Sequence, residues 1–73
     1  MDINTASELV ARIIGQKISY RKDNSETRSF TVVSVEKFDL AKSTGKWYMR
    51  AKLIDHDDGL SEKERTLHLE GIS

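Results

Sequence analysis

The spacing of the apolar residues changes once along this chain, and that change sets the outline of the fold. Up to Ile14 the apolar side chains recur every three or four residues, which is typical of one face of a helix. From Lys17 onward they alternate with polar side chains, which is typical of strands with one buried face. Gly15 lies between the two patterns, where a helix commonly ends in a left-handed residue. The chain is therefore expected to form one N-terminal helix followed by an antiparallel sheet.

The helix is predicted to span about residues 6–14. Thr5 and Glu8 match a capping box, in which the threonine hydroxyl and the glutamate carboxylate each accept a hydrogen bond from a free amide at the helix start. The expected apolar stripe consists of Ala6, Leu9, Val10, Ile13 and Ile14. A helix of about nine residues is not stable alone in water, so this stripe is expected to pack on the sheet.

Four or five strands are predicted after the helix. Their ranges are about 17–21, 27–35, 46–54 and 65–69, and residues 36–40 either continue the second strand or form another. Both faces of the second strand are partly apolar, which suits a long strand that bends and changes the side it buries. Polar clusters at 22–25 and 43–45 predict turns, and the acidic stretch 55–62 predicts a loop.

A helix followed by short antiparallel strands is the outline of a small SH3-like or Sm-like barrel. The expected fold class is therefore mainly β with one N-terminal α-helix, and the bent sheet is expected to cover about residues 17–72. A chain of 73 residues, of which 37% are hydrophobic and 33% charged, has room for a single domain, 1–73, with a thin core.

Composition excludes several classes of protein. The chain has no cysteine, which rules out disulfides and thiolate metal sites and favours a cytoplasmic location. No apolar run approaches the roughly 20 residues that a membrane span needs. Twelve basic and twelve acidic residues give zero net charge. Composition alone therefore does not indicate binding to nucleic acid, which usually needs a basic excess or a basic face.

The segment 46–51, Lys-Trp-Tyr-Met-Arg-Ala, resembles the signature of the WYL domain, a Sm-like barrel module of bacterial regulators. The family has a Trp-Tyr-Leu tripeptide on a central strand, often followed two residues later by alanine. Met49 replaces the leucine here with little change of volume. Residues 17–21 are similar to the first strand of the family, and 65–72 to its closing strand. Two features depart from the family: the run 28–32 lacks the usual proline, and no helix-turn-helix domain accompanies the barrel.

The resemblance implies a module that senses a ligand. WYL domains are thought to bind nucleotides or single-stranded nucleic acid in a groove lined by the tripeptide and by basic residues. Carried over to this sequence, the binding residues would be Tyr20, Trp47, Tyr48 and Arg65, with Arg28 as a further candidate.

Trp47 and Tyr48 are expected to differ in burial, because neighbouring residues of a strand point to opposite faces. We expect the Trp47 indole to fill the barrel and Tyr48 to lie on the outer surface. Tyr48 then shares a face with Arg50 and Lys52, and we call these three residues the aromatic–basic strip. An aromatic ring beside cations suits the stacking of a base while the cations meet phosphates. A solvated strand face explains the same charges equally well.

Neither metal binding nor catalysis is indicated. The acidic loop Asp55–Gly59 lacks the glutamate that a calcium loop needs at its twelfth position, which is Thr66 here. His56 and His68 are far apart and have no further ligands for zinc. The sequence contains no cysteine nucleophile, Gly-rich phosphate loop or serine elbow, so no enzyme activity, cofactor or metal is expected.

Three functional hypotheses follow from the sequence. The first is a non-enzymatic regulatory module that recognises nucleic acid or a nucleotide through Tyr20, Arg28, Tyr48, Arg50, Lys52 and Arg65. The alternative is a small protein-interaction module, such as an adaptor or an inhibitor from a phage or mobile element, that acts through a sheet edge or the acidic loop. Self-assembly through edge strands, as in Sm-like rings, is a third hypothesis.

Overall fold

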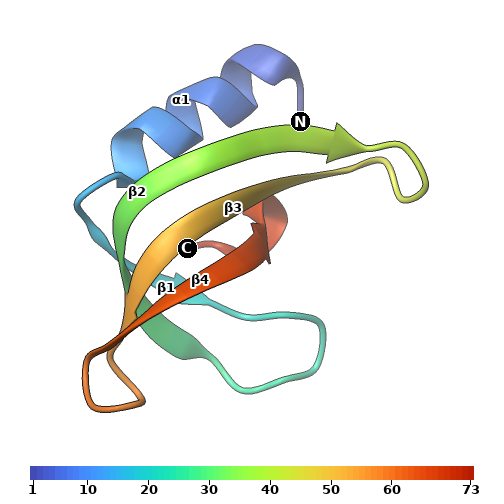
Figure 1. The fold of residues 1–73 in the computed structure, drawn as a ribbon. Coiled ribbons are helices and arrows are strands. Elements are labelled where there is room, and N and C mark those ends of the chain that lie inside the picture. The colour runs from blue at the N-terminus through green and yellow to red at the C-terminus, as the bar shows by residue number, and fades with distance from the viewer.

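The strands of the sheet are arranged in space in the order in which they occur in the sequence, and one helix lies across the hollow side of the sheet (Figure 1). The computed structural model describes all residues, 1–73. Its elements are α1 (Ile3–Ile13), β1 (Lys17–Tyr20), β2 (Arg28–Ala41), β3 (Lys46–Asp55), β4 (Ser61–His68) and the 3-10 helix η1 (Leu69–Gly71). Neighbouring strands are antiparallel throughout. The expected class, mainly β with one N-terminal helix, is confirmed.

β2 is strongly bent because two of its residues have no partner on β3. The register between the two strands shifts at Val33 and again at Glu36, which are bulged residues. Each bulge moves the inward positions by one residue: Val32 is buried, Val33 is 43% exposed, and Val35 packs on the core again. The predicted bend and change of buried side are therefore confirmed, and residues 36–40 continue the same strand.

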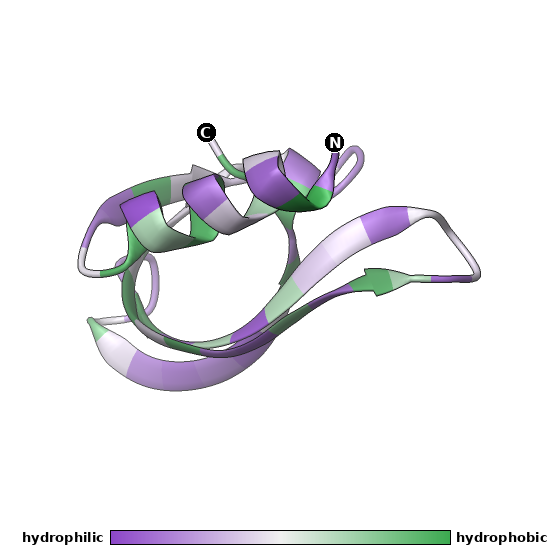
Figure 2. Cartoon of the chain, turned by 90° about the horizontal axis from the view of Figure 1, so that it is seen from above, coloured by the Kyte–Doolittle hydropathy of each residue, from purple (hydrophilic) through white to green (hydrophobic).

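The core lies between α1 and the concave face of the sheet, and Figure 2 shows α1 spanning the opening of the curved strands. Its 12 buried residues are Ala6, Val10, Ile13, Ile18, Tyr20, Phe30, Val32, Met49, Ala51, Leu53, Leu67 and Leu69. Complete burial of a large apolar side chain contributes about 1.5–3 kcal/mol. With so few residues in the core, the loss of any large one removes a sizeable part of the stability of such a small domain.

α1 begins and ends earlier than predicted. Asp2 is the N-cap, because its carboxylate accepts a hydrogen bond from the Thr5 amide at 2.8 Å. The capping box expected at Thr5 is therefore wrong. The stripe that packs on the sheet consists of Ala6, Leu9, Val10 and Ile13. Ile14, predicted as part of this stripe, follows the helix and is exposed, as is Ile3. Gly15 follows the helix with a φ of 79°, the left-handed conformation expected at this position. α1 is the only α-helix, and with 11 residues and a polar face it does not suit a membrane span.

β4 begins at Ser61, earlier than the predicted start of the last strand at residue 65. The acidic loop is correspondingly shorter than expected. The missed residues 61–64 do alternate between faces, but both faces carry charges: Glu62 points outward, while Lys63 lies opposite the buried Leu53 of β3. A strand segment without apolar residues gives no hydrophobic periodicity, so the pattern could not show it.

The sheet does not close into the expected barrel, since β1 and β4 are the two ends of the strand order. β1 nevertheless has a second neighbour, which is the segment that follows η1. The backbones of Ser19 and Ser73 exchange two hydrogen bonds of 3.1 and 2.9 Å, and the Arg21 amide donates to the Gly71 carbonyl at 3.0 Å. β4 has no such neighbour, and one of its edges stays unpaired.

Candidate functional site

A groove of about 610 Å³ lies between the β1–β2 loop and β4. Buried side chains form its floor, and these are Tyr20, Phe30 and Leu67. Three cationic side chains line its walls, and these are Lys22 of the loop, Arg28 of β2 and Arg65 of β4. The rest of the lining is polar and consists of Ser25, Glu26, Thr27, Asp57 and Thr66. We call this hollow the basic groove.

Arg28 is held in the wall of the basic groove by a buried carboxylate. Its Nη2 donates to Oδ2 of Asp55 at 2.7 Å, and its guanidinium carbon lies 5.9 Å from the centre of the Phe30 ring. The Nε atom of Arg28 is buried and has no hydrogen-bond partner. Asp55 occupies the last inward position of β3, where the apolar alternation of the strand ends in a charged residue. The buried acid therefore fixes the direction of one cation of the groove.

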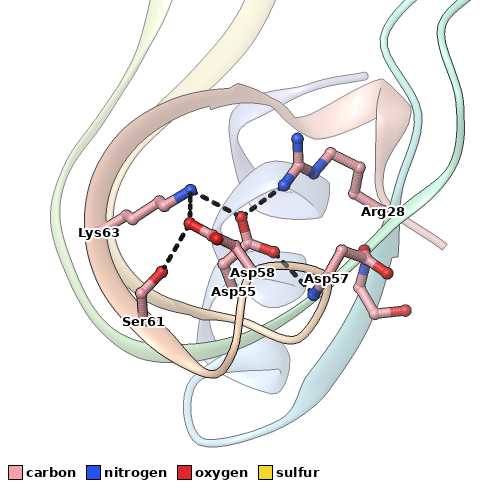
Figure 3. Close-up of polar contacts among 7 residues, drawn as sticks. Arg28, Asp55, Asp57, Asp58, Ser61 and Lys63 are labelled. Carbon is pink, nitrogen blue, oxygen red and sulfur yellow. Dashed lines mark hydrogen bonds and ion pairs between the residues drawn. The ribbon is translucent and has the colours of Figure 1, made fainter.

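Asp55 has further partners that make its burial tolerable. The Lys63 ammonium donates to Oδ2 at 3.1 Å, and the Asp57 amide donates to Oδ1 at 2.9 Å (Figure 3). Burial alone would raise the pKa of Asp55. The hydrogen bonds from Lys63 and from the Asp57 amide, together with the charge of Arg28, instead lower this pKa below its ordinary value of 3.8. Asp55 is therefore ionised at neutral pH although no part of it is exposed.

The acidic loop that follows β3 is tied down by hydrogen bonds. The Asp57 carboxylate accepts from the Ser29 amide at 2.8 Å. The Asp58 carboxylate accepts from the Lys63 ammonium at 2.8 Å and from the Ser61 hydroxyl at 3.1 Å (Figure 3). The contacts with Lys63 and Ser61 lower the pKa of Asp58. No three histidine or acidic side chains are arranged to hold a metal ion. The acidic side chains of the loop therefore hold the connection between β3 and β4 in place.

The cations of the aromatic–basic strip face glutamates on both sides of β3. Nε of Arg50 lies 3.0 Å from the Glu64 carboxylate and 3.9 Å from that of Glu36, and Nζ of Lys52 lies 3.8 Å from that of Glu62. The nearby carboxyl group of Glu64 raises the pKa of Glu36. Each exposed ion pair is weak. Together these pairs still neutralise the cations, so a phosphate on the strip would have to displace carboxylates.

Trp47 and Tyr48 are both half-buried, so the expected contrast between a buried indole and an exposed phenol is not present. Nε1 of Trp47 donates to the backbone carbonyl of Met1 at 2.9 Å. Trp47 pairs with Leu40 near the tip of the β2–β3 hairpin, which projects beyond α1 in Figure 1. Its ring packs against the margin of the core and lies 6.0 Å from the ring of Phe38, so it is covered only in part. Met49, two residues further along the same face, is the fully buried residue of this segment.

The predicted site residues lie in two places. Three of them, Tyr20, Arg28 and Arg65, line the basic groove, and the other three, Tyr48, Arg50 and Lys52, lie on the outer face of β3. Tyr20 is buried, and its hydroxyl accepts a hydrogen bond from the His68 amide at 3.1 Å. Its ring therefore forms part of the groove floor and does not offer a face for stacking.

Sequence reasoning missed two residues of the site. Asp55 could have been found from the alternation of β3. The inward positions recur every second residue, and the position after Leu53 is Asp55, although the sequence around it has the composition of an acidic loop. Lys22 lies in the irregular β1–β2 loop, and no periodic pattern predicts which way a loop side chain points. Its place in the basic groove depends on how the loop folds back toward Arg65.

Comparisons of the chain with protein-family models, with curated proteins and with solved structures give no match. The resemblance to the WYL signature stays an expectation drawn from the sequence motif.

Proposed function

We propose that this chain is a non-enzymatic binding module that holds the phosphate of a nucleotide, free or within single-stranded nucleic acid, in the basic groove. The observation that carries the proposal is that Lys22, Arg28 and Arg65, which come from three separate segments, line one groove. Lys22 and Arg65 make no ion pair within the protein. Two cations are therefore available for an anionic ligand without the loss of an internal contact.

The three cations differ in how they would contribute. Arg28 is already fixed by Asp55, so little side-chain freedom would be lost when it meets a phosphate. Arg65 offers a planar guanidinium group, whose donors match two phosphate oxygens at once. Of the two acids in the lining, Asp57 is engaged by the Ser29 amide, and this reduces its opposition to an anion.

The finer assignment of the fold belongs to the same proposal. The pairing of residues 71–73 with β1 supports an SH3-like or Sm-like arrangement, in which the end of the chain returns to the first strand. The resemblance of residues 46–51 to the WYL signature favours the same class of ligand. We therefore propose that the chain is a WYL-like regulatory module, with the basic groove rather than the aromatic–basic strip as the centre of the site.

The proposal is tested by titrating the protein with a nucleoside monophosphate and, separately, with a short oligothymidylate. Affinity should fall steeply as salt is added, because phosphate contacts release counterions. The double variant Lys22→Glu with Arg65→Glu should bind more weakly by roughly a hundredfold, since a hydrogen bond to a charged group is worth about a factor of ten or more. The two ligands distinguish a nucleotide sensor from a strand-binding module.

The matched control is Lys37→Glu with Lys42→Glu, which changes the net charge equally at positions outside the groove lining. This control should retain most of the affinity. A second comparison is Arg50→Glu with Lys52→Glu: a larger loss there than in the groove variant would move the site to the aromatic–basic strip. Unchanged affinity of the groove variant for both ligands, or no binding of either, would refute the proposal.

A further inference from the structure

β4 presents an unpaired edge to solvent. It is the last strand of the sheet, and no backbone group of residues 62–67 makes a hydrogen bond outside the ladder with β3. An edge strand with free amides and carbonyls is a template for a further strand. Natural proteins protect such edges with charged side chains, with bulges or with a covering element. β4 carries charges at residues 62–65, but it has no bulge, since its register with β3 is regular over its whole length.

The contact between Tyr20 and His68 shows which backbone groups point to this edge. The His68 amide donates to the Tyr20 hydroxyl and therefore points away from β3. Hydrogen-bonding direction alternates along an antiparallel strand. Glu62, Glu64 and Thr66 consequently direct their amides and carbonyls to the open edge, while Lys63 and Arg65 direct theirs to β3.

The side chains along the edge carry opposite charges on the two faces of β4. Arg65, on the groove face, has no acidic partner, and beyond it lie Lys22 and Arg28 of the basic groove. On the outer face, Glu62 and Glu64 are already neutralised by cations of β3. A strand added to this edge would therefore meet uncompensated positive charge on the groove face only.

A second copy of this chain offers no acid to Arg65. The outward backbone groups belong to even-numbered residues, so Arg65 would face an odd-numbered residue of the other β4 in any antiparallel pair, and none of these residues is acidic. When two β4 strands pair antiparallel about Glu64, Glu64 faces its own copy and Lys63 faces Arg65 of the other chain. When they pair about Arg65, two arginines face each other. Like charges directly opposite each other destabilise a strand pair. The same argument favours a strand of another protein that carries acids.

We propose that β4 accepts an extended acidic segment of a partner protein as an additional antiparallel strand. The segment would have acidic residues at alternate positions, so that one faces Arg65 and the next reaches over the basic groove. Its intervening residues would lie on the outer face and direct their backbone groups to Glu62, Glu64 and Thr66. This interaction goes beyond the proposed nucleotide site, although the two share Arg65.

The probe is a capped peptide of alternating threonine and glutamate with the length of β4, 8 residues. It should bind saturably and slow the hydrogen exchange of the Glu62, Glu64 and Thr66 amides, whereas a threonine–lysine peptide should not bind. N-methylation of its threonines removes the donors that face β4 and should weaken binding roughly tenfold or more. N-methylation of its glutamates, whose amides face away, should leave the affinity unchanged.

A variant of the protein separates this edge from the nucleotide site. Glu64→Pro removes an outward amide without breaking the ladder with β3, and Glu64 is not part of the groove lining, so this variant should weaken the peptide but not the nucleotide. Glu64→Gln, which keeps the amide and loses only the charge, should bind the peptide normally. If Glu64→Pro does not fold, the peptide series still decides the question. Equal binding of both peptides, or full affinity after N-methylation of the threonines, would overturn the proposal.

Discussion

The backbone of Gly71 lies against the ring of Tyr20. A β-carbon on Gly71 would be 2.8 Å from Cε1 of that ring and 2.5 Å from the Arg21 carbonyl oxygen, both closer than real β-carbons approach other atoms. The Arg21 amide also donates to the Gly71 carbonyl, so this close approach is part of the contact between β1 and the end of the chain. Glycine is required here by space rather than by backbone conformation.

The variant Gly71→Ala should therefore be destabilised. The added methyl group would push the terminal segment away from β1 or displace the Tyr20 ring, and overpacking of this kind costs about 1–3 kcal/mol. Denaturation in urea, followed by circular dichroism, measures the effect. Ser73→Ala, in the same segment, is the control and should be neutral, because only the backbone of Ser73 pairs with Ser19. Equal stability of Gly71→Ala and the wild type would contradict the geometry.

Tyr20→Phe should lower stability by about 0.5–1.5 kcal/mol, because the His68 amide loses its acceptor while the ring stays in the core. Hydrogen exchange distinguishes this cause from a general loss of packing. The amide of His68 should exchange faster, while that of Leu67, which faces β3, should change only with global stability. A protected His68 amide in the variant would show that the hydroxyl is not its partner.

Apolar spacing predicted the helix, the strands with one buried face and the bend of β2. It failed where the inward positions of a strand are charged. Asp55 ends the inward face of β3 and was assigned to the acidic loop. Lys63 occupies an inward position of β4 but was left outside the predicted strand, which began only at Arg65. These residues face the groove side because the core ends there, and no local pattern reveals where a core ends.

The candidate site could be predicted only in part for a related reason. Alternation correctly placed Tyr48, Arg50 and Lys52 on one face of β3, but it could not show that β4 brings glutamates beside them. That requires the register between β3 and β4, which depends on the loop between them. Arg28 and Arg65 meet in one groove only because β2 bends, and the bend results from bulges whose positions the sequence does not mark.

Two variants distinguish the observed N-cap of α1, Asp2, from the predicted one, Thr5. Asp2→Ala should lower the melting temperature by about 4–8 °C, because the Thr5 amide and its neighbours lose the carboxylate that accepts from them. Thr5→Ala keeps that hydrogen bond, which uses the backbone of Thr5, and should have little effect. If Thr5→Ala lowered the melting temperature more than Asp2→Ala did, the capping box predicted from Thr5 would be correct after all.

Acid should weaken the fold partly through Asp55. The pKa of Asp55 lies below its ordinary value of 3.8 in the folded protein. Its ionised form therefore stabilises the fold at all pH values above about 4, and this contribution is lost as the pH falls through the lower folded pKa. Asp55→Asn removes the charge that Arg28 and Lys63 share, so the variant should be less stable at pH 7 and should lose less stability on acidification.

Urea denaturation of the wild type and of Asp55→Asn between pH 2 and pH 7 measures this contribution. The acid sensitivity should decrease without vanishing, because the pKa values of Asp2 and Asp58 are also lowered by their hydrogen bonds. Glu8→Gln, which replaces an exposed acid of α1 that makes no ion pair, is the control and should follow the wild-type curve. If the free energy of unfolding depended on pH in the same way for Asp55→Asn and the wild type, Asp55 would have the same pKa in the folded and the unfolded protein. The buried carboxylate would then have no stabilising role.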